Sequence, residues 1–388
     1  MTIELNSRLK NAVFAFRGYN VHNLGRTPEL LAHSQFGPIV EKYLAEAGRT
    51  CSDVIGREVD LIQRVREEKE TELSDYAEAI ALIVAVEQAQ IRLLEEFHNV
   101  RYADGRLATG FSLGEISALV AGGVYEMSDA LRIPLAMASD GIELAADVTL
   151  GVLFSRKAAL PMDKLDRILL EINNAGEGMI GMSTILSPNS VLVLGTGDTL
   201  VQLRAKAKES LPKGVHLRRN EHKWPPLHTS ITWERQIPDR AAMQLRTLPG
   251  GFTAPSLPIL SHVTGDISYT DTNSRQLIRN WIDHPQRLWD VVCKILSMGV
   301  KTVIHVGPAP NIIPATFGRM AVDVEAQTKG SRGMRALSVA IRRPWLQALL
   351  PNSASLLRAP LVEHVILEDW LLDGSKDDDG SETPVVSP

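Results

Sequence analysis

Residues 110–114 read Gly-Phe-Ser-Leu-Gly, a Gly-x-Ser-x-Gly pattern that is typical of a serine nucleophile on a tight strand-to-helix turn. A short apolar stretch precedes the pattern, and apolar residues at helical spacing follow it as far as residue 120. On such a turn the Ser112 hydroxyl would point into a cleft, where the N–H of Leu113 could stabilise an oxyanion. An ordinary helix start explains the pattern equally well, because Ser112 and Glu115 also fit a capping box.

A serine nucleophile needs a base, and the base needs an orienting group. The chain has ten histidines, of which His228 follows a loop stiffened by two prolines at 225–226. His216 and His222 lie among Arg and Lys residues and fit an ordinary basic surface. His228 is the candidate base, although a loop histidine alone fits a solvated position too.

Composition narrows the classes of protein that this chain could be. The 388 residues carry a net charge of −5, which argues against a nucleic-acid binder. The two cysteines, Cys51 and Cys293, form no metal-type spacing with the histidines, so we expect reduced thiols and no metal. Residues 1–16 show no secretory signal, and the apolar run Ala79–Val86 is too short to span a membrane. We therefore expect a soluble, cytoplasmic monomer that binds neither nucleic acid nor membrane.

The elements expected around the motif suggest two folding units in the α/β class. Residues 149–219 show the order βαββαβ, which predicts a ferredoxin-like unit inserted into a larger one. Its Gly195-Thr196-Gly197 turn does not fit a dinucleotide fingerprint, because residue 200 is leucine. Other expected elements are a strand at 11–16, helices at 74–97, with a capping box at Asp75 and Glu78, and at 274–281, and a strand at 300–306.

These elements predict a discontinuous large domain at 1–148 and 220–330 and a small subdomain at 149–219. A C-terminal extension would cover 331–373. The Asp-, Gly-, Ser- and Pro-containing residues 374–388 predict a disordered acidic tail.

The segment from Gly110 to Val124 resembles the serine elbow of malonyl-CoA:acyl-carrier-protein transacylases and polyketide acyltransferase domains. The resemblance covers roughly residues 12–320 and implies an α/β-hydrolase-like core with the ferredoxin-like insertion. Further segments that resemble the family's motifs are Phe14 to Gly18, Leu227-His228, His284-Pro285 with Trp289, and Val306-Gly307-Pro308.

The resemblance implies a reaction in which Ser112 attacks an acyl thioester while His228 takes and returns the proton. The backbone carbonyl of His284 would orient the imidazole, and the N–H groups of Leu113 and Arg17 would form the oxyanion hole. Acyl-CoA would be the donor, and the phosphopantetheine thiol of an acyl carrier protein the acceptor. No cofactor would be bound permanently. The pathway implied is fatty acid or polyketide biosynthesis.

Three residues depart from the family's pattern. Phe111 replaces the elbow histidine, and Arg17 replaces a glutamine. The family's malonyl-binding arginine stands 25 residues after the serine, where this chain has Met137. Because methionine offers no charge to a carboxylate, we expect a pocket of Phe111, Met137 and Leu227 that accepts non-malonyl acyl groups at least as well.

Three other functions stay open at the level of sequence. Water could replace the carrier thiol, which would make the chain an acyl-thioester hydrolase. The altered elbow could instead belong to a catalytically impaired protein that binds carrier proteins. A serine and aspartate lipase using Asp140 is a weaker alternative, since Asp140-Gly141 is a short match.

Overall fold

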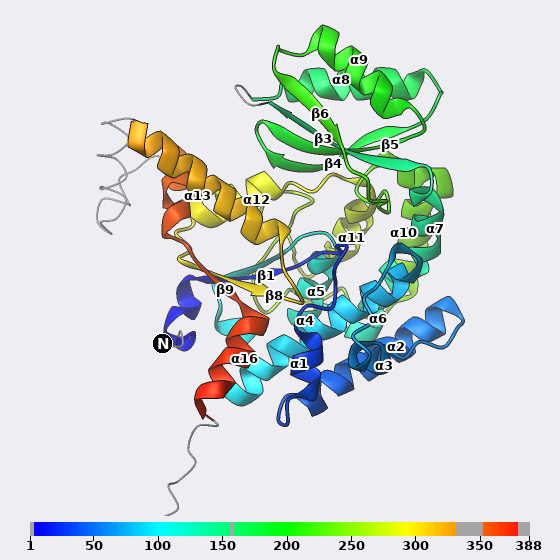
Figure 1. The fold of residues 1–388 in the computed structure, drawn as a ribbon. Helices are drawn as coiled ribbons and strands as arrows, with labels where there is room; N and C mark the ends of the chain where they lie inside the picture. The colour runs from blue at the N-terminus through cyan, green and yellow to red at the C-terminus, as the bar shows by residue number, and fades with distance from the viewer. Residues whose placement is uncertain (1–3, 156–158, 331–351, 379–388) are drawn as a thin grey trace, which may run out of the picture.

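The computed structural model describes residues 4–155, 159–330 and 352–378. Its centre is a five-stranded parallel sheet with the strand order β7-β2-β1-β8-β9 (Figure 1). The strands are β1 (Ala12–Phe16), β2 (Leu107–Gly110), β7 (Ile259–Leu260), β8 (Thr302–Val306) and β9 (Glu363–Ile366).

Both faces of this sheet are covered, which explains why its middle strand, β1, is apolar at every position. Side chains of β1 alternate between two hydrophobic cores: Phe14 and Phe16 face one, and Val13 and Ala15 the other. Helices on the Phe14 side include α2 (Gly37–Ile55), α4 (Tyr76–His98), α5 (Leu113–Ala121) and α6 (Met127–Ala136). Helices on the Val13 side are α12 (Leu288–Ser297) and α13 (Ile312–Gly330).

Shorter elements complete the large unit. The α-helices are α1 (Thr27–Ala32), α3 (Leu61–Arg66), α7 (Ala138–Ala145), α10 (Ile237–Thr247), α11 (Ser274–Asp283) and α16 (Leu367–Asp378). The 3-10 helices are η1 (Asn6–Asn11), η2 (Leu73–Asp75), η3 (Tyr102–Asp104), η4 (Ser230–Arg235) and η5 (Asn352–Leu361).

The segment between α7 and residue 219 forms a second, antiparallel sheet with the order β4-β5-β3-β6. Figure 1 shows both of its helices on the side away from the large sheet. Its elements are β3 (Val148–Ser155), α8 (Met162–Asn174), β4 (Ile180–Ser187), β5 (Ser190–Thr196), α9 (Thr199–Ser210) and β6 (Val215–Arg219). The mixed α/β class and the βαββαβ order are therefore as predicted.

The predicted helix at 74–97 forms as α4, but the predicted capping box at its start is wrong. Asp75 makes no capping hydrogen bond, because its carboxylate pairs with Arg64 at 3.2 Å, and Glu78 pairs with the same guanidinium at 2.6 Å. Residues 374–378, the first part of the predicted tail, continue helix α16. Residues 379–388 lie outside the described residues. The C-terminal piece adds β9 to the large sheet, although residues 331–351 lie outside the described residues too.

Candidate active site

The predicted turn forms between β2 and α5. Ser112 stands there with φ 52° and ψ −119°, a conformation that residues with a side chain rarely adopt. A Cβ on Gly110 would lie 2.0 Å from the backbone of Gly114, and a Cβ on Gly114 would lie 2.4 Å from the carbonyl oxygen of Phe16. Because these contacts are to backbone atoms, the two glycines make the strained turn possible.

The turn directs the Ser112 hydroxyl to His228. Its Oγ lies 2.7 Å from Nε2 of His228 and makes no capping hydrogen bond with α5. His228 is 4% exposed and also has a positive φ, 65°. Its backbone N–H donates to the carbonyl of Ile282 at 2.6 Å. The alternative of an ordinary capping serine is therefore wrong.

The second ring nitrogen of His228 contacts the carboxyl end of α11. Nδ1 lies 2.6 Å from the carbonyl oxygen of Trp281. Since a carbonyl only accepts, Nδ1 carries the proton, and Nε2 is free to accept from the Ser112 hydroxyl. This pair has the geometry of a nucleophile and an oriented general base.

The orienting carbonyl was predicted at His284, and the structure corrects this to Trp281. Helix α11 ends at Asp283, so Trp281 is among the last four carbonyls, which have no partner inside the helix. His284 follows the helix; its N–H donates to Asn280 at 2.9 Å, and its ring contacts Asp283 at 2.6 Å. The resemblance at His284-Pro285 therefore indicated a segment close to the orienting carbonyl but not the residue.

Two side chains that the sequence analysis missed hold the backbone of Ser112. The indole N–H of Trp281 donates to the Ser112 carbonyl oxygen at 2.9 Å. Oε1 of Gln286 accepts from the Ser112 N–H at 3.1 Å. Both residues are buried, at 1% and 0% exposure. No local sequence signal connects them to a serine 169 and 174 positions away.

The two amides predicted for an oxyanion hole have different environments. Leu113 begins α5, so its N–H is one of the amides that a helix cannot pair internally. The N–H of Arg17 donates to Oε1 of Glu87 at 2.8 Å and to the carbonyl of Val306 at 3.2 Å. The structure thus contradicts the prediction for Arg17, because pairing between β1 and β8 continues through this amide.

The Arg17 side chain is buried and fully engaged with backbone and amide groups. Nε donates to the Gly18 carbonyl at 2.8 Å, and one Nη donates to Asn23 at 2.8 Å. The other Nη donates to the carbonyls of His22 and Pro308. Burial lowers the pKa of Arg17 to about 10. The guanidinium fixes the loop after β1.

The residues predicted to line the acyl pocket are all buried but fall in two cores. Phe111 belongs to the core on the α12 and α13 side, where its ring meets His262 edge-on at 5.6 Å. Met137 and Leu227 belong to the opposite core, and Met137 stands at the junction of α6 and α7. A pocket formed by these three residues together is therefore still a prediction.

Burial controls the charge of the candidate base and of a second histidine beside it. Burial lowers the pKa of His228 to about 4, so the imidazole is neutral near pH 7. His262, which the sequence analysis missed, is 0% exposed, and its Nε2 lies 3.1 Å from Oγ1 of Thr109. Burial lowers its pKa to about 3, with a smaller effect from His228.

Glu115 ties the first turn of α5 to the loop after β7. Its Oε1 accepts from the hydroxyls of Ser261 at 2.5 Å and Tyr269 at 2.8 Å, and its Oε2 accepts from the His262 N–H at 3.1 Å. Burial raises the pKa of this carboxyl to about 7. The Glu115 carboxylate therefore anchors helix α5 to this loop and forms no capping box with Ser112.

Other candidates from the sequence have structural partners. Asp140, weighed for a serine and aspartate pair, forms an ion pair with Arg240 at 2.6 Å. In the described part of the chain, no cluster of three or more His, Cys, Asp or Glu residues could hold a metal ion. Over the same residues, no helix is long and apolar enough to cross a bilayer.

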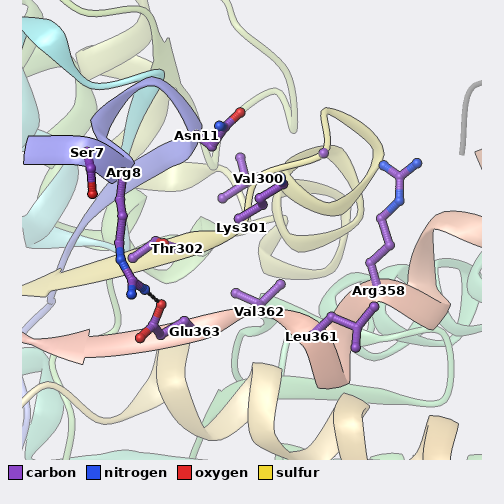
Figure 2. Close-up of a pocket in the computed structure, with 11 residues that line it drawn as sticks. Ser7, Arg8, Asn11, Val300, Lys301, Thr302, Arg358, Leu361, Val362 and Glu363 are labelled. Carbon is purple, nitrogen blue, oxygen red and sulfur yellow. Dashed lines mark ion pairs between the residues drawn. The ribbon is translucent and has the colours of Figure 1, made fainter. Parts of the chain in front are cut away.

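A cavity of about 530 Å³ lies at the other end of the large sheet (Figure 2). It is bordered by the amino ends of β8 and β9, whereas Ser112 and His228 lie at the carboxyl end of the sheet. Arg8 pairs there with Glu363, and Arg358 donates to the carbonyl of Leu296 at the end of α12. Arg8, Glu363 and Arg358 thus have structural partners beside this cavity.

Comparisons with known proteins agree with the resemblance seen in the sequence. No family model matches the chain. The chain is 25% identical over 301 residues to the malonyl CoA-acyl carrier protein transacylase of Salmonella typhimurium, covering 76% of this chain and 88% of that protein. It is 26% identical over 265 residues to the spectinabilin polyketide synthase system protein NorB of Streptomyces orinoci, of which it spans 11%.

Solved structures show the same fold at lower identity. FabD from Acinetobacter baumannii superimposes with a TM-score of 0.63 at 19% identity, over 78% of this chain and 89% of that one. A malonyl-transacylase solved with a type II PKS acyl-carrier protein gives a TM-score of 0.62 at 22% identity, over 79% and 92%. In sequence the chain is similar to malonyl CoA-acyl carrier protein transacylases, and it shares the fold of their solved structures.

Proposed function

We propose that the chain is an acyltransferase that moves an acyl group from CoA to the phosphopantetheine thiol of an acyl carrier protein. One observation carries the proposal: Ser112 Oγ, the His228 ring and the Trp281 carbonyl form a continuous hydrogen-bonded series with distances of 2.7 and 2.6 Å. The names of its relatives, which are malonyl CoA-acyl carrier protein transacylases, support the substrate class.

In the first half-reaction Ser112 Oγ would attack the thioester carbonyl while Nε2 of His228 takes the hydroxyl proton. A C–O bond forms, and the oxyanion is stabilised by the N–H of Leu113. Collapse of the tetrahedral intermediate breaks the C–S bond. The departing CoA thiolate then receives the proton from the imidazolium, which leaves an acyl ester on Ser112.

In the second half-reaction the phosphopantetheine thiol would give its proton to His228 and attack the ester carbonyl. Expulsion of Ser112 Oγ, which recovers that proton, regenerates the enzyme and gives ping-pong kinetics. Both proton transfers use the same nitrogen, because the Trp281 carbonyl keeps Nδ1 protonated throughout. No permanently bound cofactor is needed for either half.

The acyl group accepted would not be restricted to malonyl. The residue at the family's carboxylate-binding position is Met137, and the Arg17 guanidinium is held by carbonyl oxygens and Asn23. A bidentate arginine is the natural partner of a carboxylate, and methionine provides only an apolar, polarizable surface. Non-malonyl acyl groups should therefore react at least as well as malonyl.

The proposal extends to the architecture. The strand order β4-β5-β3-β6 and the βαββαβ connectivity support a ferredoxin-like subdomain at 149–219. Residues 1–148 and 220–330 would form an α/β-hydrolase-like domain, followed by the extension at 331–373. The proposal also includes a cytoplasmic location, a monomeric state and an acyl carrier protein as the partner.

Intact-mass analysis after incubation with malonyl-CoA, acetyl-CoA and longer acyl-CoAs tests the proposal. We expect acyl adducts on the wild-type chain and none on Ser112→Ala, followed by transfer to an added acyl carrier protein. A malonyl adduct alone would contradict the acyl preference. Steady CoA release without carrier protein would favour the hydrolase, and the absence of any adduct would favour the catalytically impaired binding protein.

A further inference from the structure

Gln286 is a fully buried polar residue that contacts both members of the candidate pair and the small sheet. Its side-chain Oε1 accepts from the Ser112 N–H at 3.1 Å, and its Nε2 lies 3.2 Å from Nδ1 of His228. Its backbone N–H donates to the Ser183 carbonyl at 2.8 Å, and its carbonyl accepts from the Ile185 N–H at 2.9 Å. One residue therefore joins strand β4 to the serine.

The orientation of the Gln286 amide follows from its neighbours. The Ser112 N–H only donates, so the oxygen end of the amide must face it. The Nδ1 proton of His228 is already donated to Trp281, so the amide nitrogen adds no hydrogen bond there. The contact that matters is therefore the acceptor at Oε1.

The backbone of Ser112 needs an external constraint, because its φ of 52° is unfavourable for a residue with a Cβ. Its carbonyl receives two donors, the indole of Trp281 and the N–H of Glu115, each at 2.9 Å. Its N–H is held by Gln286. Removing this acceptor would leave a buried amide unpaired and let the elbow relax.

We propose that Gln286 is a positioning residue that holds the Ser112 elbow within reach of His228 and couples it to strand β4. The inference rests on the proposed roles of Ser112 and His228 as nucleophile and base. It makes the small sheet part of the support of the reaction centre, because the main chain of Gln286 forms a bridge to Thr184.

Gln286→Met is the decisive variant, because it keeps the side-chain length and removes the acceptor. Its main-chain bonds to β4 remain available in any substitution. Gln286→Glu restores an acceptor and places a carboxylate beside Nδ1 of His228. The matched control is Gln88→Met, since Gln88 is 6% exposed and binds the carbonyl of Ser117 in α5 at 3.0 Å.

The rate of inactivation by diisopropyl fluorophosphate measures the reactivity of Ser112 with His228 without any acyl-CoA. An O–P bond forms at Ser112, fluoride leaves, and the hydroxyl proton passes to His228. We expect Gln286→Met to react about 100-fold more slowly than wild type, as for a misplaced nucleophile, and Gln88→Met to react at the wild-type rate. Gln286→Glu should recover rate over Gln286→Met, with the midpoint of its rate against pH moved upward, because a carboxylate raises the pKa of the neighbouring imidazole.

Equal rates for wild type and Gln286→Met would overturn the inference, and so would an unchanged pH midpoint in Gln286→Glu. A wild-type chain that does not react at all would overturn it as well. Thermal unfolding identifies any variant that fails to fold; the pH comparison of Gln286→Glu with wild type then decides. If labelling by diisopropyl fluorophosphate depends on Gln286 but no acyl-CoA gives an adduct, the result contradicts only the proposed acyl transfer and leaves the role of Gln286 in place.

Discussion

At the carboxyl ends of β1 and β2, polar groups are buried and meet across long stretches of chain. The amino ends of β8 and β9 border a cavity of about 530 Å³ whose ion pair, between Arg8 and Glu363, is more than a third exposed on both sides. Ser112 and His228 have strained backbones, whereas Arg8 and Glu363 form an ordinary, partly exposed ion pair. In this protein strain and burial, rather than cavity volume, mark the candidate active site.

The largest effect should follow from removing either member of the buried pair. Ser112→Ala and His228→Ala should each reduce acyl transfer by roughly 10⁴- to 10⁶-fold, and the double variant should be little worse, because the two groups act as a unit. Single-turnover rates with acetyl-CoA measure this. Additive losses in the double variant would contradict a shared role.

The two glycines of the elbow between β2 and α5, Gly110 and Gly114, should be the most sensitive positions for stability. Gly110→Ala would place a Cβ 2.0 Å from backbone atoms of Gly114, so we expect a loss of at least about 3 kcal/mol in the free energy of unfolding. The control is Gly318→Ala, since a Cβ on this exposed helical glycine has open space. That variant should gain about 0.5–1 kcal/mol. Urea denaturation compares the two, and similar stabilities would refute the close-packing argument.

Buried groups near Ser112 should shape the dependence of stability on pH. The folded pKa values of His228, about 4, and His262, about 3, lie below the ordinary histidine value. The unfolded chain then binds more protons, and stability should fall as the pH drops from about 6.5 to 4. Glu115, with a folded pKa of about 7, has the opposite effect, so stability should also fall as the pH rises from about 4.5 past 7.

Thermal unfolding from pH 4 to 9 measures both the acid and the alkaline decrease in stability. We expect the free energy of unfolding to change by a few kcal/mol, at about 1.4 kcal/mol for each pH unit over which the folded and unfolded states differ by one proton. Glu115→Gln should flatten the alkaline limb. A flat profile of Glu115→Gln between pH 4 and 6.5 would show that the folded protein protonates these histidines as readily as the unfolded chain does.

The smallest effect should come from the amino-end cavity. Arg8→Ala should change the free energy of unfolding by less than about 1 kcal/mol, because an ion pair this exposed is screened by water and salt. Labelling of Ser112 should be unchanged. A large loss of labelling in Arg8→Ala would break the distinction between the two ends of the sheet.

Local signals predicted most of the elements and the approximate place of the site. Period-2 and helical spacing located the strand before Arg17, the helix around residue 80 and the βαββαβ order of the small unit, because these patterns reflect burial on one or two faces. The sequence analysis missed strand β9. Its four residues lie far along the chain from β8, and so short an edge strand is recognised only from its hydrogen-bonded pairing with β8.

The sequence by itself determined the elbow and the identity of the two side chains that meet there. Glycine at 110 is required by its contact with Gly114, four residues away, so the local pattern carries that information, whereas glycine at 114 is required by the backbone of Phe16 in β1. The tertiary structure alone decided which carbonyl orients His228, that Gln286 holds the serine, and that the Arg17 amide is already paired with Glu87. Those contacts join residues 53 to 174 positions apart, and their geometry depends on how helices and strands pack, which no short pattern records.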